Sequence, residues 1–280
     1  MAMSASSRPT TGHLQLMGRV VITGNIRAIT GLRIGSSDRS IGIGEASPVL
    51  RDALTTRPYI PGSSLRGKLR SLAERIRWHD LSRDLQSTNG PKIHQCPKTT
   101  GQAEAQQYRD CPICPVFGVP SDHIHATPTR LMVRDMILSD SSADQLYRTR
   151  TELPYTEVKY EVAIDRITAA SNPREIERVP AGAVFSGLDL SFSVYEAADV
   201  KRFAVVAQAM ALLEDDYLGG HGARGYGRIE FTGLKVTIKD YRRGSVRTDD
   251  RDYGSTYELA QGSDAVGSWI NETLTPGRSV

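Results

Sequence analysis

The chain has 280 residues, of which 39% are hydrophobic, and its 35 Lys and Arg residues face 32 Asp and Glu residues. This composition is typical of a globular protein with a buried core, and so small a positive surplus excludes a histone-like polycation. No apolar run reaches the roughly 20 residues of a membrane-spanning helix, and the start of the chain is polar, unlike a signal peptide. We therefore expect a soluble, cytoplasmic protein that does not contact a membrane.

Residues 1–17 are predicted to be a flexible N-terminus, and the first strand follows them. Apolar side chains alternate with others through Val20, Ile22 and Ile26, which indicates a half-buried strand. The chain then passes into a loop rich in glycine and serine that ends at Pro48 and is expected to be exposed.

The next segment predicts a helix whose first turn could hold a phosphate. Leu65, Leu69, Leu72 and Ile76 recur at helical spacing behind a Pro-Gly-Ser-Ser start that supplies an N-cap. Free backbone amides at a helix start, together with hydroxyl groups and cations, suit a nucleic-acid backbone. The alternative is an ordinary amphipathic helix with a solvated basic face. The hydroxyl groups and cations belong to Ser63, Ser64, Arg66, Lys68 and Arg70.

All three cysteines, Cys96, Cys111 and Cys114, lie within one short segment. An odd and clustered set argues against a disulfide framework. Together with His94, the cysteines form two closely spaced pairs of ligands that suit a closed, tetrahedral and therefore structural zinc site. Residues 81–126 are accordingly interpreted as a zinc-binding insertion that is folded around the metal rather than around a core.

Two alternatives to this metal site stay open. His123 or His125 could replace the upstream histidine as the fourth ligand. The cysteines could also be small buried apolar residues that have a histidine nearby by chance.

Two strand-like segments flank the turn-prone residues 170–173, so residues 155–185 are predicted to form a long hairpin. Without the two insertions, the elements run strand, helix, strand, strand, helix, strand. This is the order of a ferredoxin-like or RNA-recognition-motif-like α+β fold. The three later strands of this order are predicted at residues 129–138, 186–195 and 227–238, and the second helix at residues 200–214.

Residues 18–238 are therefore interpreted as one domain. The remaining residues, 239–280, are mostly polar and, apart from residues 266–270, lack a sustained apolar period. We expect this tail to be loosely ordered or to dock on a neighbouring molecule.

A second glycine-rich segment, residues 218–227, precedes the last predicted strand. Its five glycines would let the chain approach another backbone closely while Arg224 is presented to it. It fits neither the dinucleotide fingerprint nor the phosphate loop, because it does not open a helix. His221 in this segment could act as an acid or base in ribonuclease chemistry. The alternative is a tight connection between a helix and a strand.

Three separated blocks carry a family resemblance: residues 30–35 with 47–52 and 59–70, residues 156–159 with 164–168 and 172–178, and residues 218–227. Together they resemble the repeating backbone subunit of type III-A CRISPR interference complexes, a member of the RAMP superfamily. The likeness covers most of residues 18–236. It implies a ferredoxin-like palm that holds guide-RNA phosphates and a thumb hairpin that splays one base at regular intervals. The implied partners are guide RNA, complementary target RNA, copies of the chain itself in a filament, and other type III effector subunits.

The resemblance assigns roles residue by residue. The implied guide-RNA contacts are Ser63, Ser64, Arg66, Lys68, Arg70, Gly220, Gly222 and Arg224. The implied thumb residues are Lys159, Arg166, Ile167, Thr168, Asn172, Arg174 and Arg178.

The resemblance also implies slicing of target RNA with a divalent metal such as Mg²⁺, by an aspartate just before a Ser-Pro-Val step. Here that position is Ala46, which can neither bind a metal nor transfer a proton. Glu45 is one residue away, and Asp38 and His221 are the other candidates. We therefore expect a subunit that binds guide and target but cleaves target poorly or not at all.

Two further functions stay open. One is an active RAMP-type endoribonuclease that slices target RNA or processes the guide precursor. The other is a zinc-stabilised protein-protein adaptor without an RNA role, which the phosphate-suited helix start disfavours.

Overall fold

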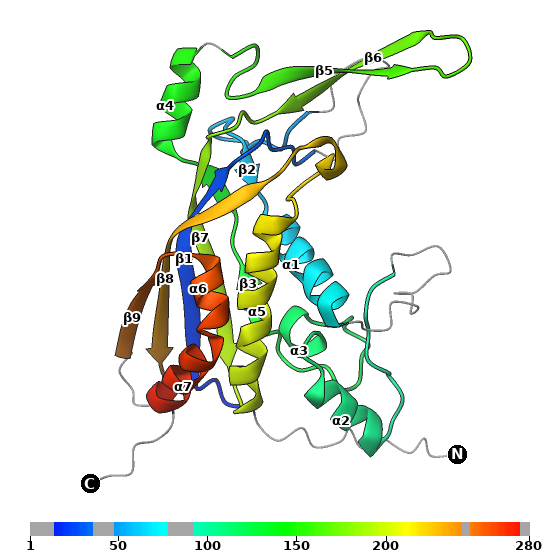
Figure 1. Ribbon diagram of the computed structural model, residues 1–280. Helices are drawn as coiled ribbons and strands as arrows, with labels where there is room; N and C mark the ends of the chain where they lie inside the picture. Colours follow the sequence, from blue (N-terminus) through cyan, green and yellow to red (C-terminus); the bar gives the residue numbers. More distant parts are fainter. Residues whose placement is uncertain (1–13, 36–47, 78–91, 150, 242–246, 275–280) are drawn as a thin grey trace.

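An antiparallel sheet forms the centre of the protein, whose computed structural model describes residues 14–35, 48–77, 92–149, 151–241 and 247–274 (Figure 1). The strands lie in the order β2-β4-β7-β1-β8-β9, and β3 also pairs with β7. Helices pack on this sheet and a separate two-stranded hairpin extends away from it, so the fold is mixed α/β. The expectation of an α+β protein is confirmed at this level.

The central strand β1 (Gly18–Ala28) lies between β7 (Val184–Val194) and β8 (Ile229–Asp240) and runs antiparallel to both. Val20 and Ile26 of β1 are fully buried, as the alternating pattern predicts. The strands predicted at 18 onward, 186–195 and 227–238 are therefore present and adjacent.

Short strands complete the sheet on the β7 side. Where the sequence predicts one strand at residues 129–138, the structure has β3 (Leu131–Val133) and β4 (Met136–Leu138), both paired with β7. Between them the Arg134 amide still donates to the Asp189 carbonyl oxygen of β7 at 3.1 Å, while the Asp135 carboxylate accepts from the Gly62 amide. The edge strand β2 (Tyr59–Ile60) pairs with β4.

Two long helices cover the sheet. Helix α1 (Gly62–Arg77) and helix α5 (Ala198–Asp215) pack against each other, and α5 also contacts β7 and β8. Both helices are predicted by their apolar periods, and their bounds extend those predictions by a few residues. Among the described residues, no helix is long and apolar enough to cross a membrane.

The prediction of a loosely ordered C-terminal tail is wrong for residues 247–274. Strand β9 (Arg247–Tyr253) pairs with β8, and helices α6 (Thr256–Gln261) and α7 (Ser263–Leu274) pack against α5. Trp269 and Ile270 of α7 are buried in the common core. A few apolar residues at helical spacing suffice here because α5 supplies the rest of the buried surface.

The insertion that carries the cysteines contains α2 (Gln102–Asp110) and α3 (Cys114–Phe117). Its Ile113 and Val116 are fully buried and belong to the same apolar core as the sheet. The prediction that this segment does not fold around a core is therefore wrong, because its apolar residues are part of the common core. The sequence misses this because the apolar residues stand in a short run without a period.

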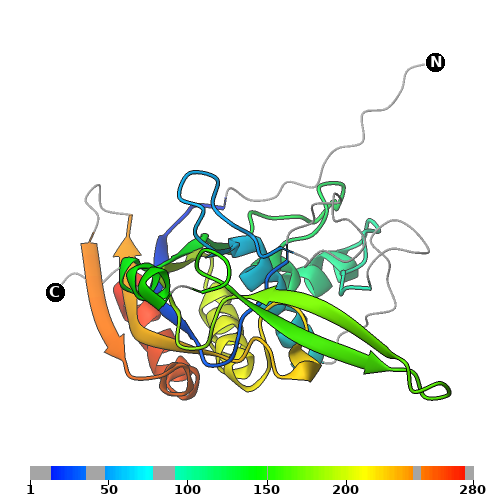
Figure 2. The ribbon, with the colours of Figure 1, turned by 90° about the horizontal axis from the view of Figure 1, so that it is seen from above.

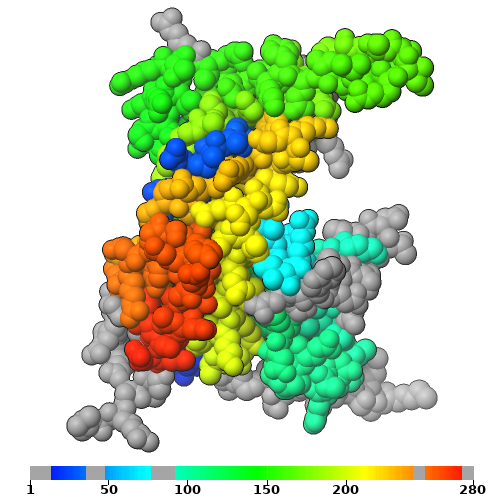
Figure 3. All heavy atoms as spheres, in the orientation of Figure 1, coloured from blue at the N-terminus to red at the C-terminus, as the bar shows by residue number. Residues whose placement is uncertain are grey.

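Helix α4 (Asp140–Thr149) follows β4 and is absent from the sequence prediction. Beyond it, β5 (Glu157–Ile164) and β6 (Ser171–Arg178) form a separate two-stranded sheet that reaches past the body of the molecule (Figures 1, 2 and 3). The predicted hairpin is thus present, but its turn is not at residues 170–173.

The turn of this hairpin lies between Ile164 and Ser171 and is closed by an aspartate. Asp165 Oδ1 accepts hydrogen bonds from the amides of Ile167 and Thr168 at 2.9 and 2.7 Å. These two amides lower the pKa of the Asp165 carboxyl group. The Asn-Pro pair that suggested a turn lies instead in β6, where a two-stranded sheet tolerates proline because both strands are edges.

Candidate nucleic-acid interface and metal centre

An aspartate carboxylate occupies the start of α1. The Gly62 amide donates a hydrogen bond to Asp135 Oδ1 at 2.7 Å. A Cβ atom at Gly62 would lie 2.2 Å from the carbonyl oxygen of Val133, so the β3 end can approach this closely only because the residue is glycine. Of the two serines predicted to contact phosphate, Ser63 is exposed and Ser64 is half-buried. The helix start thus already has one internal anion.

Two of the α1 cations bind backbone carbonyl groups of the cysteine-bearing insertion and its flank. Arg66 donates to the carbonyl oxygens of Phe117 at 2.6 Å and Leu131 at 3.2 Å, and burial, aided by the charge of Arg70, lowers its pKa. Arg70 donates to the carbonyl oxygen of His94 at 2.8 Å. These bonds tie α1 to the insertion, whatever else the two side chains contact.

The third α1 cation, Lys68, ties α1 to the end of α5. Its Nζ lies 3.0 Å from Asp216 Oδ2 and 3.8 Å from the ring centroid of Tyr217. The side chain of Lys68 is only 14% exposed. Its positive charge is therefore largely balanced within the protein.

The glycine-rich segment 218–227 folds back on the chain that follows β1. Gly220 donates its amide hydrogen to the carbonyl oxygen of Arg33 at 2.8 Å, and Gly227 donates to that of Gly31 at 3.0 Å. Gly219 has a φ of +81°, and a Cβ atom there would lie 2.2 Å from the Arg33 carbonyl oxygen. The expected close approach of two backbones is thus made within the chain itself.

Tyr226, near the end of this segment, lies among charged side chains from the inner half of the β5–β6 hairpin, residues 157–161 and 174–178, which we call the hairpin base. Its hydroxyl donates to Glu161 Oε1 at 2.9 Å. The Lys159 ammonium lies 4.5 Å and the Arg178 guanidinium 5.0 Å from the Tyr226 ring centroid. We call this group the Tyr226 cluster. Its members are Arg33, Lys159, Glu161, Arg174, Arg178, His221, Arg224 and Tyr226.

Glu161 is the anion at the centre of the Tyr226 cluster. Its carboxylate lies 3.1 Å from Arg174, 3.6 Å from Arg224 and 3.8 Å from Lys159. Burial opposes ionisation of Glu161, but the Tyr226 hydroxyl and these cations outweigh it and lower the pKa of Glu161. Burial and the Glu161 carboxylate together raise the pKa of Tyr226 to about 12. Glu161 is therefore ionised and Tyr226 is protonated at neutral pH.

His221 belongs to the same cluster. Its Nδ1 lies 3.0 Å from an Arg224 nitrogen that can only donate, and its ring centroid lies 5.6 Å from that of Tyr226. Burial, followed by the charges of Arg33 and Arg224, lowers the pKa of His221. The imidazole is therefore neutral at pH 7, and its Nδ1 is occupied by Arg224.

The hairpin base is also joined to residues 49–51 through a buried carboxylate. Glu177 of β6, 3% exposed, accepts a hydrogen bond from the Val49 amide at 2.8 Å. Its other oxygen lies 2.5 Å from Arg51 and 2.6 Å from the Thr156 hydroxyl. The three catalytic candidates just before this point, Asp38, Glu45 and Ala46, lie outside the described residues. Sequence reasoning missed Glu177 because its partners are far away in the chain.

The other predicted hairpin residues lie at or near its exposed tip. Arg166, Ile167 and Thr168 are in the turn, and the Ile167 side chain is 94% exposed. Asn172 is exposed on β6, opposite Ala163. The turn residues thus lie beyond the Tyr226 cluster along the hairpin, whereas Asn172 is only two residues from Arg174 of that cluster.

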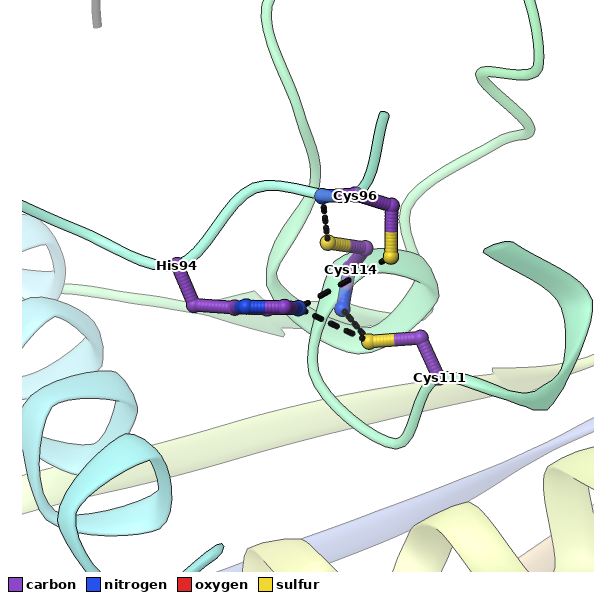
Figure 4. Close-up of side chains that lie close together, drawn as sticks. All are labelled: His94, Cys96, Cys111 and Cys114. Carbon is purple, nitrogen blue, oxygen red and sulfur yellow. Dashed lines mark hydrogen bonds between the residues drawn. The ribbon is translucent and has the colours of Figure 1, made fainter. Parts of the chain in front are cut away.

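His94, Cys96, Cys111 and Cys114 converge as predicted, with their side chains pointing toward one another (Figure 4). All four residues are buried, and their ligand atoms lie within 4.8 Å of one another. His94 Nε2 is 3.3 Å from Cys111 Sγ and 3.7 Å from Cys96 Sγ. A tetrahedral zinc ion would set nitrogen and sulfur ligands about 3.6 Å apart. The donor set therefore fits zinc.

Backbone amides donate hydrogen bonds to two of these sulfurs. The amides of Ile113 and Cys114 lie 3.4 and 3.3 Å from Cys111 Sγ, and the Cys96 amide lies 3.4 Å from Cys114 Sγ. Hydrogen bonds from the Cys114 and Cys96 side chains lower the pKa of the Cys111 thiol, and the same contact with Cys111 raises the pKa of Cys114, so without a metal Cys111 is the thiolate of this pair. Thiolate is the form that binds a metal.

The alternative ligands His123 and His125 have other partners. His123 Nδ1 accepts from the His125 amide, so its Nε2 carries the proton and donates to the Cys96 carbonyl oxygen at 3.0 Å. Burial lowers the pKa of His123, in keeping with a neutral ring. The His125 ring contacts the Thr99 carbonyl oxygen at 3.0 Å. The described geometry favours His94 as the fourth ligand.

Replacing Cys114 with Ser is expected to abolish zinc binding and to lower the melting temperature by about 10 °C, on a scale of ~2–4 °C per kcal/mol. The remaining buried thiolates would then lose the metal ion that neutralises their negative charge. Zinc content by elemental analysis and thermal unfolding by circular dichroism measure both effects. His125→Ala is the control and should keep the metal. Equal zinc contents in C114S and the wild type would contradict the site.

Comparison with known proteins gives a family. A model of the RAMP superfamily matches residues 25–230. The protein named CRISPR system Cms endoribonuclease Csm3 of Methanothermobacter thermautotrophicus is 39% identical over 239 residues, which are 80% of this chain and 89% of that protein. The protein of the same name from Streptococcus thermophilus is 36% identical over 78% of this chain and 90% of its own length.

Solved structures agree with the sequence relatives. A chain of the Csm3-Csm4 subcomplex from a type III-A CRISPR-Cas interference complex is 29% identical, with a TM-score of 0.54, over 90% of this chain and 98% of its own. Csm3 of Methanopyrus kandleri has a TM-score of 0.62 at 20% identity, over 91% of this chain and 98% of its own, which shows the shared fold. The chain therefore belongs to the RAMP superfamily and, within it, to the Csm3 family.

Proposed function

We propose that the chain is a backbone subunit of a type III CRISPR effector complex, which polymerises along guide RNA and positions complementary target RNA. The family match over most of the chain supports this role. The observation that carries the RNA contact is the Tyr226 cluster, where cations from the glycine-rich segment and from the hairpin base meet. Grouped cations that hold phosphates without reading bases suit a protein that binds any guide sequence.

The core of the sheet supports a ferredoxin-like palm. Without the edge strands β2 and β9, the order is β4-β7-β1-β8, with α1 after β1 and α5 after β7. This matches the strand-helix-strand-strand-helix-strand order that the sequence predicts. In this proposal β5 and β6 are the thumb.

The proposed guide contacts differ in how far their charged side chains are exposed to solvent. The side chains of Arg174 and Arg224 are 45% and 48% exposed, whereas those of Lys68 and Arg70 are 14% and 16% exposed. We therefore assign the stronger phosphate attraction to the hairpin base and the glycine-rich segment, which includes Gly220 and Gly222. The α1 residues would add backbone and hydroxyl contacts from Ser63 and Ser64.

We propose structural zinc at His94, Cys96, Cys111 and Cys114. All four donors are protein atoms, so zinc would hold the insertion in place without activating a substrate. Among the described residues this is the group of His, Cys, Asp or Glu donors that could hold a metal. A divalent ion such as Mg²⁺ for target cleavage, and a cytoplasmic location, stay predictions from the sequence.

Loss of slicing is the remaining part of the proposal and rests on Ala46. The alternative, an active endoribonuclease, is favoured by one observation, which is that the curated relatives are named endoribonucleases. Glu45, Asp38 and His221 are its candidate residues.

Binding of single-stranded RNA tests the RNA contact directly. Arg224→Gln is expected to weaken binding about three- to tenfold and to reduce the slope of log K against log salt by about one, because one phosphate contact is lost. Fluorescence anisotropy with a labelled guide at several salt concentrations measures both values. Arg134→Gln, at an exposed arginine between β3 and β4, is the matched control. Equal losses in the two variants would contradict a specific contact at Arg224.

Co-expression with a guide RNA and the other effector subunits tests assembly. Size-exclusion chromatography is expected to show an oligomer that forms with RNA and dissociates after ribonuclease treatment. A chain that stays monomeric with RNA at low salt and recovers no partner subunit would refute the backbone role.

A further inference from the structure

Glu161 stands where an RNA phosphate would be expected to bind. Its Oε1 accepts a hydrogen bond from the Tyr226 hydroxyl and lies within ion-pair distance of Lys159, and its Oε2 lies within ion-pair distance of Arg174 and Arg224. A hydroxyl and several cations around two anionic oxygens are also what a phosphodiester needs. The Glu161 carboxylate thus occupies a site whose hydroxyl group and cations could also bind another anion.

The burial of these side chains sets the arrangement in space. The Glu161 side chain is 12% exposed, whereas its partners Arg174 and Arg224 are nearly half exposed. The carboxylate is therefore more buried than the two guanidinium groups that pair with it. An incoming phosphate could reach the exposed parts of these guanidinium groups while Glu161 stays paired with them.

Glu161 and Arg174 are directly opposite each other on β5 and β6, which fixes their pairing by the register of the hairpin. Arg224 comes from the glycine-rich segment, so the carboxylate also joins the hairpin base to the palm. The Glu161 side chain is thus held by one arginine of the hairpin and by one of the glycine-rich segment.

We infer that Glu161 is a built-in counter-ion that competes with RNA phosphate for Arg174 and Arg224 and thereby limits how tightly the hairpin base holds RNA. This inference rests on the proposed RNA-binding function. A limited affinity lets the chain exchange one RNA register for another, because cations that are already paired gain less from a phosphate than free cations do.

The opposite role is physically distinct. If Glu161 served only to orient the two arginines, removing its charge would let them move and would weaken RNA binding. If it competes, removing its charge frees positive potential and strengthens binding. The sign of the change therefore separates the two roles.

The test compares Glu161→Gln with Glu175→Gln in the full chain, using a labelled single-stranded RNA of guide length. Glu175 is an exposed carboxylate of the same hairpin, opposite Tyr160, so both variants lose one negative charge. E161Q is expected to bind about three- to tenfold more tightly at low salt, with a salt slope steeper by up to about one, and E175Q to change little.

Ultraviolet titration of tyrosine provides a readout without RNA. The high-pH transition assigned to Tyr226, which is missing in a Tyr226→Phe reference, is expected to move down in E161Q because the carboxylate that raises it is gone. If the wild type binds RNA and E161Q binds no more tightly than E175Q, the inference is wrong and the proposed function stands. If the wild type binds no RNA at low salt, both are refuted.

Discussion

Replacing Ala46 with Asp is expected to raise target-RNA cleavage by the assembled complex by about a hundredfold or more, the scale of one acid-base side chain. The reason is chemical, since the methyl group of Ala46 can neither bind a divalent metal nor move a proton, whereas a carboxylate can do both. A labelled target complementary to the guide, incubated with Mg²⁺ and resolved by gel electrophoresis, gives the rate. Regularly spaced products should appear in A46D and be scarce in the wild type.

Ala46→Asn is the matched control for this gain. Asn has nearly the size of Asp but no charge, so A46N should stay as slow as the wild type. Regularly spaced cuts by the wild type that are lost in Glu45→Ala would instead favour the active endoribonuclease. Products that persist after removal of divalent ions would contradict metal-assisted slicing.

Replacing Glu177 with Ala is expected to lower the free energy of unfolding by about 3–5 kcal/mol, the usual cost of removing one partner of a buried ion pair. Arg51 would lose its counter-ion, and the Val49 amide and the Thr156 hydroxyl would lose their acceptor. Urea unfolding followed by circular dichroism measures the change.

Glu175→Ala is the control for this loss, because Glu175 is exposed two residues away on the same strand. Its cost should stay within about 0.5 kcal/mol, as for ordinary surface positions. If E177A and E175A unfolded at the same urea concentration, the buried network would contribute nothing to stability, and the hairpin base would have to be held by other contacts.

The parts of the fold that repeat a local pattern could be predicted from the sequence. Strand β1 and helices α1 and α5 follow from the spacing of apolar residues, and the cysteine cluster follows from ligands that are close in sequence. The turn of the hairpin was misplaced because the Asn-Pro pair at 172–173 is a stronger turn signal than the Asp165 side chain that closes the real one.

The unpredicted parts of the candidate site depend on contacts between distant residues. Arg66 looks like a free cation in the sequence, but it donates to the backbone carbonyl groups of Phe117 and Leu131, which any residue type can supply. Arg70 has one partner at helical i,i+4 spacing, Glu74, but its bond to the His94 carbonyl oxygen has no sequence signal. Glu161 and Tyr226 meet across 65 positions of the chain. No periodic pattern in the sequence marks two residues so far apart as partners, so their contact is visible only in the folded structure.

The place of β1 at the centre of the sheet has a consequence for the order in which the protein folds during synthesis. Gly18 at the start of β1 pairs with Val194 on one side and with Asp240 on the other. One edge of β1 can pair with β7 once residue 194 has left the ribosome, but its other edge stays unpaired until β8 is complete at residue 240. The proposed zinc ligands, His94, Cys96, Cys111 and Cys114, are close together in the chain and would be available to a metal long before then. The cysteine-bearing insertion thus has the chance to fold before the sheet on which it finally packs.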